Sequence, residues 1–299
     1  MSPRKRPTAR FAGAWPRTGS GILCCLALAI ATGAQNPEKS EVAKQYEALA
    51  TAKNEAGLIE LWRKHPTEVL GTIDADLEES LALREKAGID STPSAEVAAQ
   101  VRALHQRALV GARAADAAFA KRIFTDYASA FVSWNSSDAK NFREGQRRHG
   151  VARKLLGEKQ YDAALSEAEG CSMLAHALGD WWGTAMGAAA LAAAFEGKGD
   201  KVQALAHYGL ARLLYHDLQL VRNEVSCVKA MVPLLLELGH VPRARAAADA
   251  ALELIDAKDV RGRTKLLEQR LAAEERLNDS EAAARTRAAL EALAQEKKP

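Results

Sequence analysis

Residues 151–164 read VARKLLGEKQYDAA and residues 191–204 read LAAAFEGKGDKVQA, with a small residue, a glycine and an alanine at matching places. Residues 231–244 (MVPLLLELGHVPRA) and 271–284 (LAAEERLNDSEAAA) follow the same pattern more loosely. The last alanine of each segment recurs every 40 residues, at Ala164, Ala204, Ala244 and Ala284. A period of about 20–50 residues is typical of stacked repeats, in which each unit buries its face against its neighbours. The pattern therefore predicts an all-α solenoid.

Helical periodicity divides this stretch into four pairs of helices joined by short turns. The predicted pairs are 138–156 with 160–177, 180–196 with 200–217, 220–238 with 241–256, and 259–276 with 279–295. Short turns make the two helices of a pair antiparallel. Pro233 lies inside a predicted helix, where its missing N–H and its ring predict a bend near Lys229–Pro233. Ser280 is the expected N-cap of the last helix.

Residues 35–137 are also expected to be helical, either as diverged hairpins or as an unrelated helical cap. The repeat register fades here, because Gly111-Ala112 and Phe124 stand one interval before the first markers. Gly111 indicates a bend or a close contact. Thr92 is the predicted N-cap of a helix with Pro93 at its first position. The apolar spacing predicts helices over 38–53, 55–64, 67–87, 94–115 and 117–134.

The first 34 residues have the pattern of a signal peptide. An apolar run, 21–31, follows five basic residues and precedes small residues that suit cleavage. The run is too short to span a bilayer, which needs about 20 apolar residues. A buried core helix is the alternative. We expect export, to the periplasm or cell envelope if the source is bacterial, and no transmembrane segment in the mature chain. The basic residues are Arg4, Lys5, Arg6, Arg10 and Arg17.

Removing this segment changes the charge of the protein. The whole chain has 41 Lys and Arg against 38 Asp and Glu, a net charge of +3. All five basic residues before residue 35 leave with the signal, so the mature chain has a net charge of −2. We therefore predict no binding of nucleic acid, which needs a basic surface.

No sequence motif indicates catalysis. The seven histidines include no pair at zinc-helix spacing with a glutamate, and no Cys-x-x-Cys or Gly-x-Ser-x-Gly is present. Cys171 and Cys227 lie in different repeats, so we expect two separate buried thiols. The sequence predicts no catalytic residue, no metal and no cofactor. An enzyme site around His105, Asp126 or Trp134 stays open as a less favoured alternative.

The four pairs resemble the tetratricopeptide repeat family in its form of roughly 40 residues. The resemblance covers about 138–293, and the second unit carries it best, with large, small and aromatic residues at the family's positions: Leu191, Ala192, Phe195, Ala204, Tyr208 and Ala211. It implies a right-handed solenoid of antiparallel hairpins. It also implies that ligands lie in a concave groove lined by the first helix of each pair.

The resemblance places a candidate partner-binding set on these first helices. Carried over by position, the groove residues are His149, Arg153, Met186, Ala193, Lys229, Gln269 and Arg276. Trp181 and Trp182 open a first helix, where they either contact a partner or fill the gap between repeats. His149 and Arg153 suit a carboxylate, although a solvated basic patch is the simpler interpretation.

These observations predict an exported, non-catalytic scaffold that binds another protein or a peptide in its concave groove. The chain is predicted to consist of a signal peptide at 1–34, a helical region at 35–137 and four repeats at 138–299. The main alternative is a structural protein that self-assembles through its alanine-rich faces. The sequence leaves the oligomeric state open.

Overall fold

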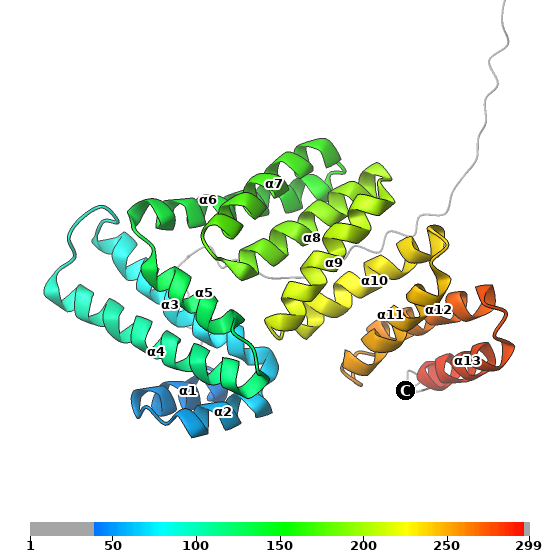
Figure 1. Ribbon diagram of the computed structural model, residues 1–299, viewed down its shortest axis with the longest axis horizontal. Helices are drawn as coiled ribbons and strands as arrows, with labels where there is room; N and C mark the ends of the chain where they lie inside the picture. Colours follow the sequence, from blue (N-terminus) through cyan, green and yellow to red (C-terminus); the bar gives the residue numbers. More distant parts are fainter. Residues whose placement is uncertain (1–38, 296–299) are drawn as a thin grey trace, which may run out of the picture. The chain divides into compact units, whose positions relative to one another are not determined.

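In the computed structural model, which describes residues 39–295, the chain is all-α, with thirteen α-helices and one short 3-10 helix and no strand in that range (Figure 1). The N-terminal helices are α1 (Glu41–Thr51), α2 (Glu55–Lys64), η1 (Pro66–Glu68), α3 (Val69–Ala87), α4 (Ala95–Phe119) and α5 (Ile123–Ser133). The others are α6 (Ser136–Gly157), α7 (Tyr161–Ala177), α8 (Trp181–Lys198), α9 (Lys201–Asp217), α10 (Val221–Glu237), α11 (Val241–Leu254), α12 (Val260–Arg276) and α13 (Ser280–Gln295).

The predicted all-α class is confirmed, and the four predicted helix pairs correspond to α6–α13. The predicted signal peptide, with Cys24 and Cys25, lies outside the described residues. Within residues 39–295, no helix is both long enough and apolar enough to cross a membrane.

The turns between α6 and α11 recur every 20 residues. Each has one residue with positive φ, at Lys159 (60°), Gly179 (69°), Gly199 (84°), Gln219 (58°) and Gly239 (78°). The residue after each one donates its N–H to a carbonyl five residues back, as Asp200 does to Phe195 at 2.9 Å. This left-handed turn ends a helix by satisfying its last carbonyls. Two such helix-and-turn units give the 40-residue period of the sequence.

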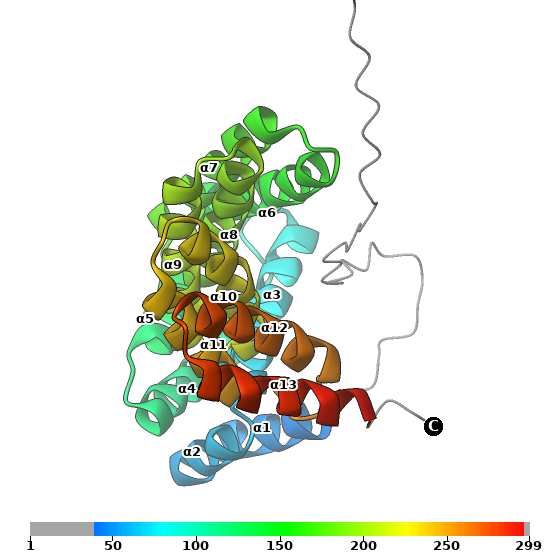
Figure 2. The same ribbon diagram turned by 90° about the vertical axis from the view of Figure 1, so that its right-hand side faces the viewer.

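Small residues at the repeat positions let the helices of a pair approach closely. Ala164, Ala204 and Ala244 have no exposed surface, and neither do Ala152 and Ala192 one helix earlier. A larger side chain there would force neighbouring backbones apart, at a cost of about 1–3 kcal/mol. Consecutive helices pack against each other throughout α6–α13, and α6 also contacts α8 as α10 contacts α12 (Figures 1 and 2). At these two places, consecutive first helices therefore lie side by side.

The register shifts by one residue before the last pair. α11 has 14 residues whereas α9 has 17, and the next left-handed turn falls at Asn278 (φ 58°), one residue early. Consequently Ala283 is buried and the predicted marker Ala284 is exposed. The predicted N-cap Ser280 is wrong for the same reason. Asp279 caps α13 by accepting from the Ala282 N–H at 3.1 Å.

Two boundaries in the N-terminal region differ from the prediction. Ser94, not Thr92, caps α4, and its hydroxyl accepts from the Val97 N–H at 3.2 Å. α4 then continues through the break predicted near residue 116 and ends at Ala120, whose φ is 54°. Serine and threonine are both common N-caps. In the sequence Ser-Thr-Pro-Ser, the serine after the proline takes this role.

Gly111 marks a close contact between α4 and the first two helices. A Cβ there would lie 2.6 Å from the Tyr46 ring, and the Gly111 carbonyl accepts from the Trp62 indole N–H at 3.0 Å. Behind this contact, the buried Asp76 accepts from Tyr46 at 2.8 Å and forms an ion pair with Arg107. α4 therefore ties α1, α2 and α3 into one core.

Pro233 lies inside a continuous helix, and a side chain of another helix donates the hydrogen bond that Pro233 cannot donate. α10 is continuous from Val221 to Glu237. The Lys229 carbonyl, which a residue 233 with an N–H would satisfy, accepts instead from the Gln269 side-chain amide on α12 at 2.8 Å. At the end of α10, the Leu236 carbonyl accepts from Arg276 at 2.7 Å. Both bonds join residues 40 apart, so α12 completes the hydrogen bonding of α10.

We expect Gln269→Leu to destabilise the protein by about 1–3 kcal/mol, since it leaves the buried Lys229 carbonyl without a donor. In a Pro233→Ala background, residue 233 regains its own N–H, and the same change should cost less than about 1 kcal/mol. Urea unfolding of the four chains measures the difference, with the exposed Gln203→Leu as a control. An equal loss in both backgrounds would show that Gln269 does not replace the missing N–H.

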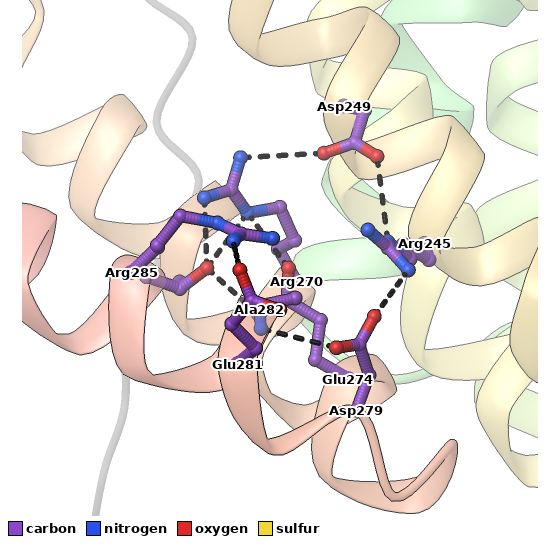
Figure 3. A network of polar contacts seen from close by, with 9 residues as sticks. Arg245, Asp249, Arg270, Glu274, Asp279, Glu281, Ala282 and Arg285 are labelled. Carbon is purple, nitrogen blue, oxygen red and sulfur yellow. Dashed lines mark hydrogen bonds and ion pairs between the residues drawn. The ribbon is translucent and has the colours of Figure 1, made fainter.

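A polar network holds the last three helices together. Figure 3 shows Arg245, Asp249, Arg270, Glu274 and Asp279 gathered between α11, α12 and α13. Arg270 contacts Asp249 at 3.3 Å and Glu274 at 3.3 Å, and Arg245 pairs with Asp279 at 3.0 Å.

The centre of this network is buried. Thr286 accepts from Arg270 at 2.7 Å and donates to Glu274 at 2.7 Å. Glu274 is only 2% exposed and Thr286 is fully buried. The last repeat therefore holds together through charge-assisted bonds.

Candidate functional site

The middle of helix α8, residues 182–194, is buried except along one stripe. Between residues 182 and 194, only four residues reach solvent, each of them partly. Their spacing of four, three and four residues places them on one face of the helix. We call them the α8 stripe: Trp182, Met186, Ala189 and Ala193. The many small residues elsewhere on this part of α8 let its neighbours cover it, so the stripe is the part that stays partly exposed.

Residues at the same repeat position flank the stripe on both sides. One interval before Ala189 is His149 on α6, and one interval after it is Lys229 on α10. α6 packs against α8, and α10 shares a buried cluster with α8 that includes Ala188 and Cys227. The predicted residues His149, Met186 and Lys229 therefore come from three first helices, of which α6 and α8 pack directly together.

The flanks of the stripe are positively charged. Arg153 is exposed on α6, and Lys229 is half-buried on α10. Burial lowers the pKa of His149 to about 4, with a further contribution from Arg153, so His149 is neutral at pH 7. The flanking charge at pH 7 therefore comes from Arg153 and Lys229.

Nearby carboxylates are engaged in other contacts. Glu224 on α10 is 2% exposed and lies 3.1 Å from His216 and 3.5 Å from Arg212. Glu196 on α8 accepts from Tyr208 at 2.7 Å. These two acids are held by side chains of α9.

The two tryptophans pack mainly inside the protein. Trp181 lies against the N-terminal core, with its ring 5.9 Å from the His176 ring. Trp182 contacts both that core and the cluster of α8, α9 and α10. They fill the gap between the N-terminal helices and the repeats, and only Trp182 also belongs to the α8 stripe.

Gln269 lies at the predicted repeat position but is buried. Its side chain is 6% exposed and donates to the Lys229 carbonyl. Gln269 was predicted to line a groove. Its observed hydrogen bond was not predicted, because it depends on a carbonyl of α10 that Pro233 leaves without an N–H donor. We therefore leave Gln269 out of the candidate site.

The residues of the alternative enzyme site have separate surroundings. His105 lies 2.9 Å from the Ser80 hydroxyl, and burial lowers its pKa with Arg84 adding to the effect. Asp126 is exposed and lies 4.0 Å from Arg122. Trp134 is buried and donates to the Leu178 carbonyl at 3.0 Å. In the part of the chain that the structure describes, no hydrogen bond or ion pair joins these three residues.

The two cysteines of the repeats are buried free thiols, as predicted. Burial raises the pKa of Cys171 to about 11 and that of Cys227 to about 12. Both stay protonated at neutral pH, and a thiol is a weak nucleophile. Among residues 39–295, no three His, Cys, Asp or Glu side chains are grouped as metal ligands.

The surface hollows are shallow and lie away from the stripe. One of about 320 Å³ lies between α3 and α6. Its basic residues already have partners: Lys140 pairs with Asp90 at 2.8 Å and Arg143 with Glu85 at 2.7 Å. Another of about 350 Å³ lies beside α4. Neither combines burial with unpaired polar groups, so neither is a strong candidate.

Sequence reasoning missed a second apolar surface. In the described range, the exposed large hydrophobic residues all lie on the second helix of a pair: Met173, Val202, Leu210, Leu213 and Leu254. Three of them are on α9, where Leu213 is 62% exposed. Their spacing of eight and three residues was visible in the sequence, on the face of α9 opposite Ala204, Tyr208 and Ala211.

Comparisons with known proteins add no further identification: no protein-family model matches the chain, and no curated protein is similar to it in sequence.

Proposed function

We propose that the protein is an exported, non-catalytic scaffold built as a right-handed solenoid of the tetratricopeptide kind. Its first helices bind a segment of another protein or a peptide. The observation that carries this proposal is the α8 stripe, a partly exposed apolar face on a helix whose other residues between 182 and 194 are buried. Apolar faces left uncovered in a soluble fold mark binding sites. Export rests on the N-terminal sequence pattern.

The flanking charges define the segment further. Arg153 and Lys229 stand on either side of four apolar or small residues. A partner with complementary charge would bring apolar side chains to Met186 and Ala189 and acidic residues to the two cations. We infer an acidic amphipathic segment, with apolar residues three or four apart if it binds as a helix.

Selection of displayed peptides on the full chain tests this proposal. We expect the enriched peptides to combine large apolar residues with a net negative charge. They should bind a Met186→Glu chain at least about tenfold more weakly, since a carboxylate would be buried among apolar groups. Leu213→Glu is the matched control on α9 and should keep full binding. Enrichment of basic peptides, or equal binding to Met186→Glu, would count against the stripe.

Self-assembly is the second candidate, favoured by the exposed apolar residues of α7 and α9. Met173 is 73% and Val202 is 64% exposed. Two copies could cover these residues by packing their second helices together. The Leu213→Glu chain separates the two candidates. A dimer that dissociates in this chain, with no peptide selected by the α8 stripe, would favour self-assembly.

A further inference from the structure

A cluster of ionisable groups lies where the N-terminal helices meet the repeats. Asp74 and Glu78 on α3, Tyr127 on α5, Arg143 on α6 and Asp180 at the start of α8 form it, and we call it the junction cluster. Tyr127 donates a hydrogen bond to Asp74, and Arg143 pairs with Glu78 at 2.8 Å. Asp180 caps α8 by accepting from the Gly183 N–H at 2.7 Å. Four helices thus contribute to one cluster.

The α7–α8 turn beside this cluster docks on α5. Its Leu178 belongs to the N-terminal core, and the Leu178 carbonyl accepts from the Trp134 indole N–H at 3.0 Å. The next residue, Gly179, approaches so closely that a Cβ on it would lie 2.8 Å from the Ala130 methyl group. The cluster therefore sits at the contact that joins the repeats to the N-terminal helices.

The cluster has more acid than base. It contains three carboxyl groups and one guanidinium, and Arg143 is shared with Glu85 at 2.7 Å. Asp180 is 6% exposed and Asp74 is half-buried. Gln146 also donates to Glu78 at 2.8 Å. Cys171 on α7 faces Asp180 as a neutral thiol and has Arg148 near it. The Arg84 guanidinium on α3 donates to the Trp134 carbonyl at 3.1 Å, beside the docked turn. With all three carboxylates ionised, the cluster carries uncompensated negative charge.

Burial and this excess of negative charge raise the pKa of Asp74 and of Asp180. Burial raises the pKa of Asp74 to about 7, with Glu78 and Asp180 adding to the effect and the Tyr127 hydrogen bond opposing it. Burial likewise raises the pKa of Asp180 to about 6, against its cap bond from Gly183 and with Glu78 adding to the rise. Both values lie above the ordinary 3.8 of an unfolded aspartate. Folding therefore takes up protons, and stability from this cluster falls as pH rises from about 4 to about 7.

We propose that the junction cluster is a proton-operated lock: protonated Asp74 and Asp180 hold the α7–α8 turn against α5, and loss of both protons loosens this contact. The turn leads directly into α8, and Asp180 lies two residues before Trp182. Loosening the turn therefore also loosens Trp182, the first residue of the α8 stripe. The lock concerns the fold of this chain and does not depend on the identity of a partner.

Thermal unfolding of the full chain between about pH 8 and pH 5 tests the lock. The wild-type Tm should rise by several degrees on acidification, since the folded state takes up protons in this range. A chain with Asp74→Asn and Asp180→Asn should lose this rise. Asparagine keeps the shape of both residues and is itself a good N-cap. Glu79→Gln, an exposed change on α3, is the matched control and should keep the wild-type slope.

Single variants test how the groups of the junction cluster affect one another. Tyr127→Phe removes a bond to ionised Asp74, so the midpoint of the pH dependence should move to higher pH. Asp180→Asn removes a neighbouring negative charge and should move it to lower pH. Hydrogen exchange of the Trp134 indole N–H, which donates to the Leu178 carbonyl across this contact, should be at least about tenfold slower at the acidic end, after correction for the chemical rate. An equal pH slope in the wild-type and double-variant chains, or exchange unaffected by pH, would overturn the proposal.

Discussion

An Arg270→Met chain is expected to lose about 3–5 kcal/mol of stability, because it leaves a buried carboxylate without its cation. Glu274 is 2% exposed and Thr286 is fully buried, and Arg270 contacts both. Figure 3 shows Arg270 and Glu274 in this network. Methionine fills much of the same volume, so the loss reports the charge and hydrogen bonds more than a cavity. Repeat arrays unfold in parts, so the effect should concentrate in α12 and α13.

Hydrogen exchange across the chain, together with urea unfolding, measures this loss. Arg285→Met is the matched control, since Arg285 is 63% exposed and pairs with Glu281 on the same helix. An exposed pair of this kind contributes at most about 1 kcal/mol. Replacing Arg270 and Glu274 together by apolar residues should recover part of the stability, because no unpaired charge then remains. Equal losses for Arg270→Met and Arg285→Met would contradict this account of the last repeat.

Charge reversal beside the α8 stripe has the largest expected effect on binding. In the Arg153→Glu, Lys229→Glu chain, both cations that flank the stripe become acids. An acidic segment would then meet repulsion on both sides, and we expect its affinity to fall about a hundredfold, or about 2.8 kcal/mol. Lys154→Glu with Lys265→Glu makes the same change in net charge at exposed positions of α6 and α12. This control chain should retain binding.

Local sequence patterns predicted the helices well. Ala164, Ala204 and Ala244 indicated the contact of paired helices correctly, since only a small side chain fits at these fully buried positions. The 55–64 helix was predicted to the residue, because Asn54 and His65-Pro66 mark its ends. Thr92 and Ser280 were wrong because several residues in each stretch can serve as a cap, and the neighbouring helices decide among them.

The candidate site was predicted only in part. The family resemblance placed His149, Met186 and Lys229 on first helices, and His149 and Lys229 share one repeat position with Ala189. It did not predict that Gln269 would bond a carbonyl 40 residues away, because this depends on how α10 and α12 pack. The junction cluster was not predicted either, because it also depends on how the helices pack. Asp74 and Asp180 are more than 100 residues apart in the sequence, and only the fold joins them.

The central claim is that first helices, at the α8 stripe, hold the partner. The most direct measurement places a photoreactive residue at Ala189 or, as a control, at the exposed Ala206 of α9, in cells that make the full chain. We predict that Ala189 captures one defined segment, rich in apolar and acidic residues. A synthetic copy of that segment should bind the purified chain, and the Arg153→Glu, Lys229→Glu chain should lose the capture. Capture from Ala206 instead, or equal capture by the charge-reversed chain, would contradict the account.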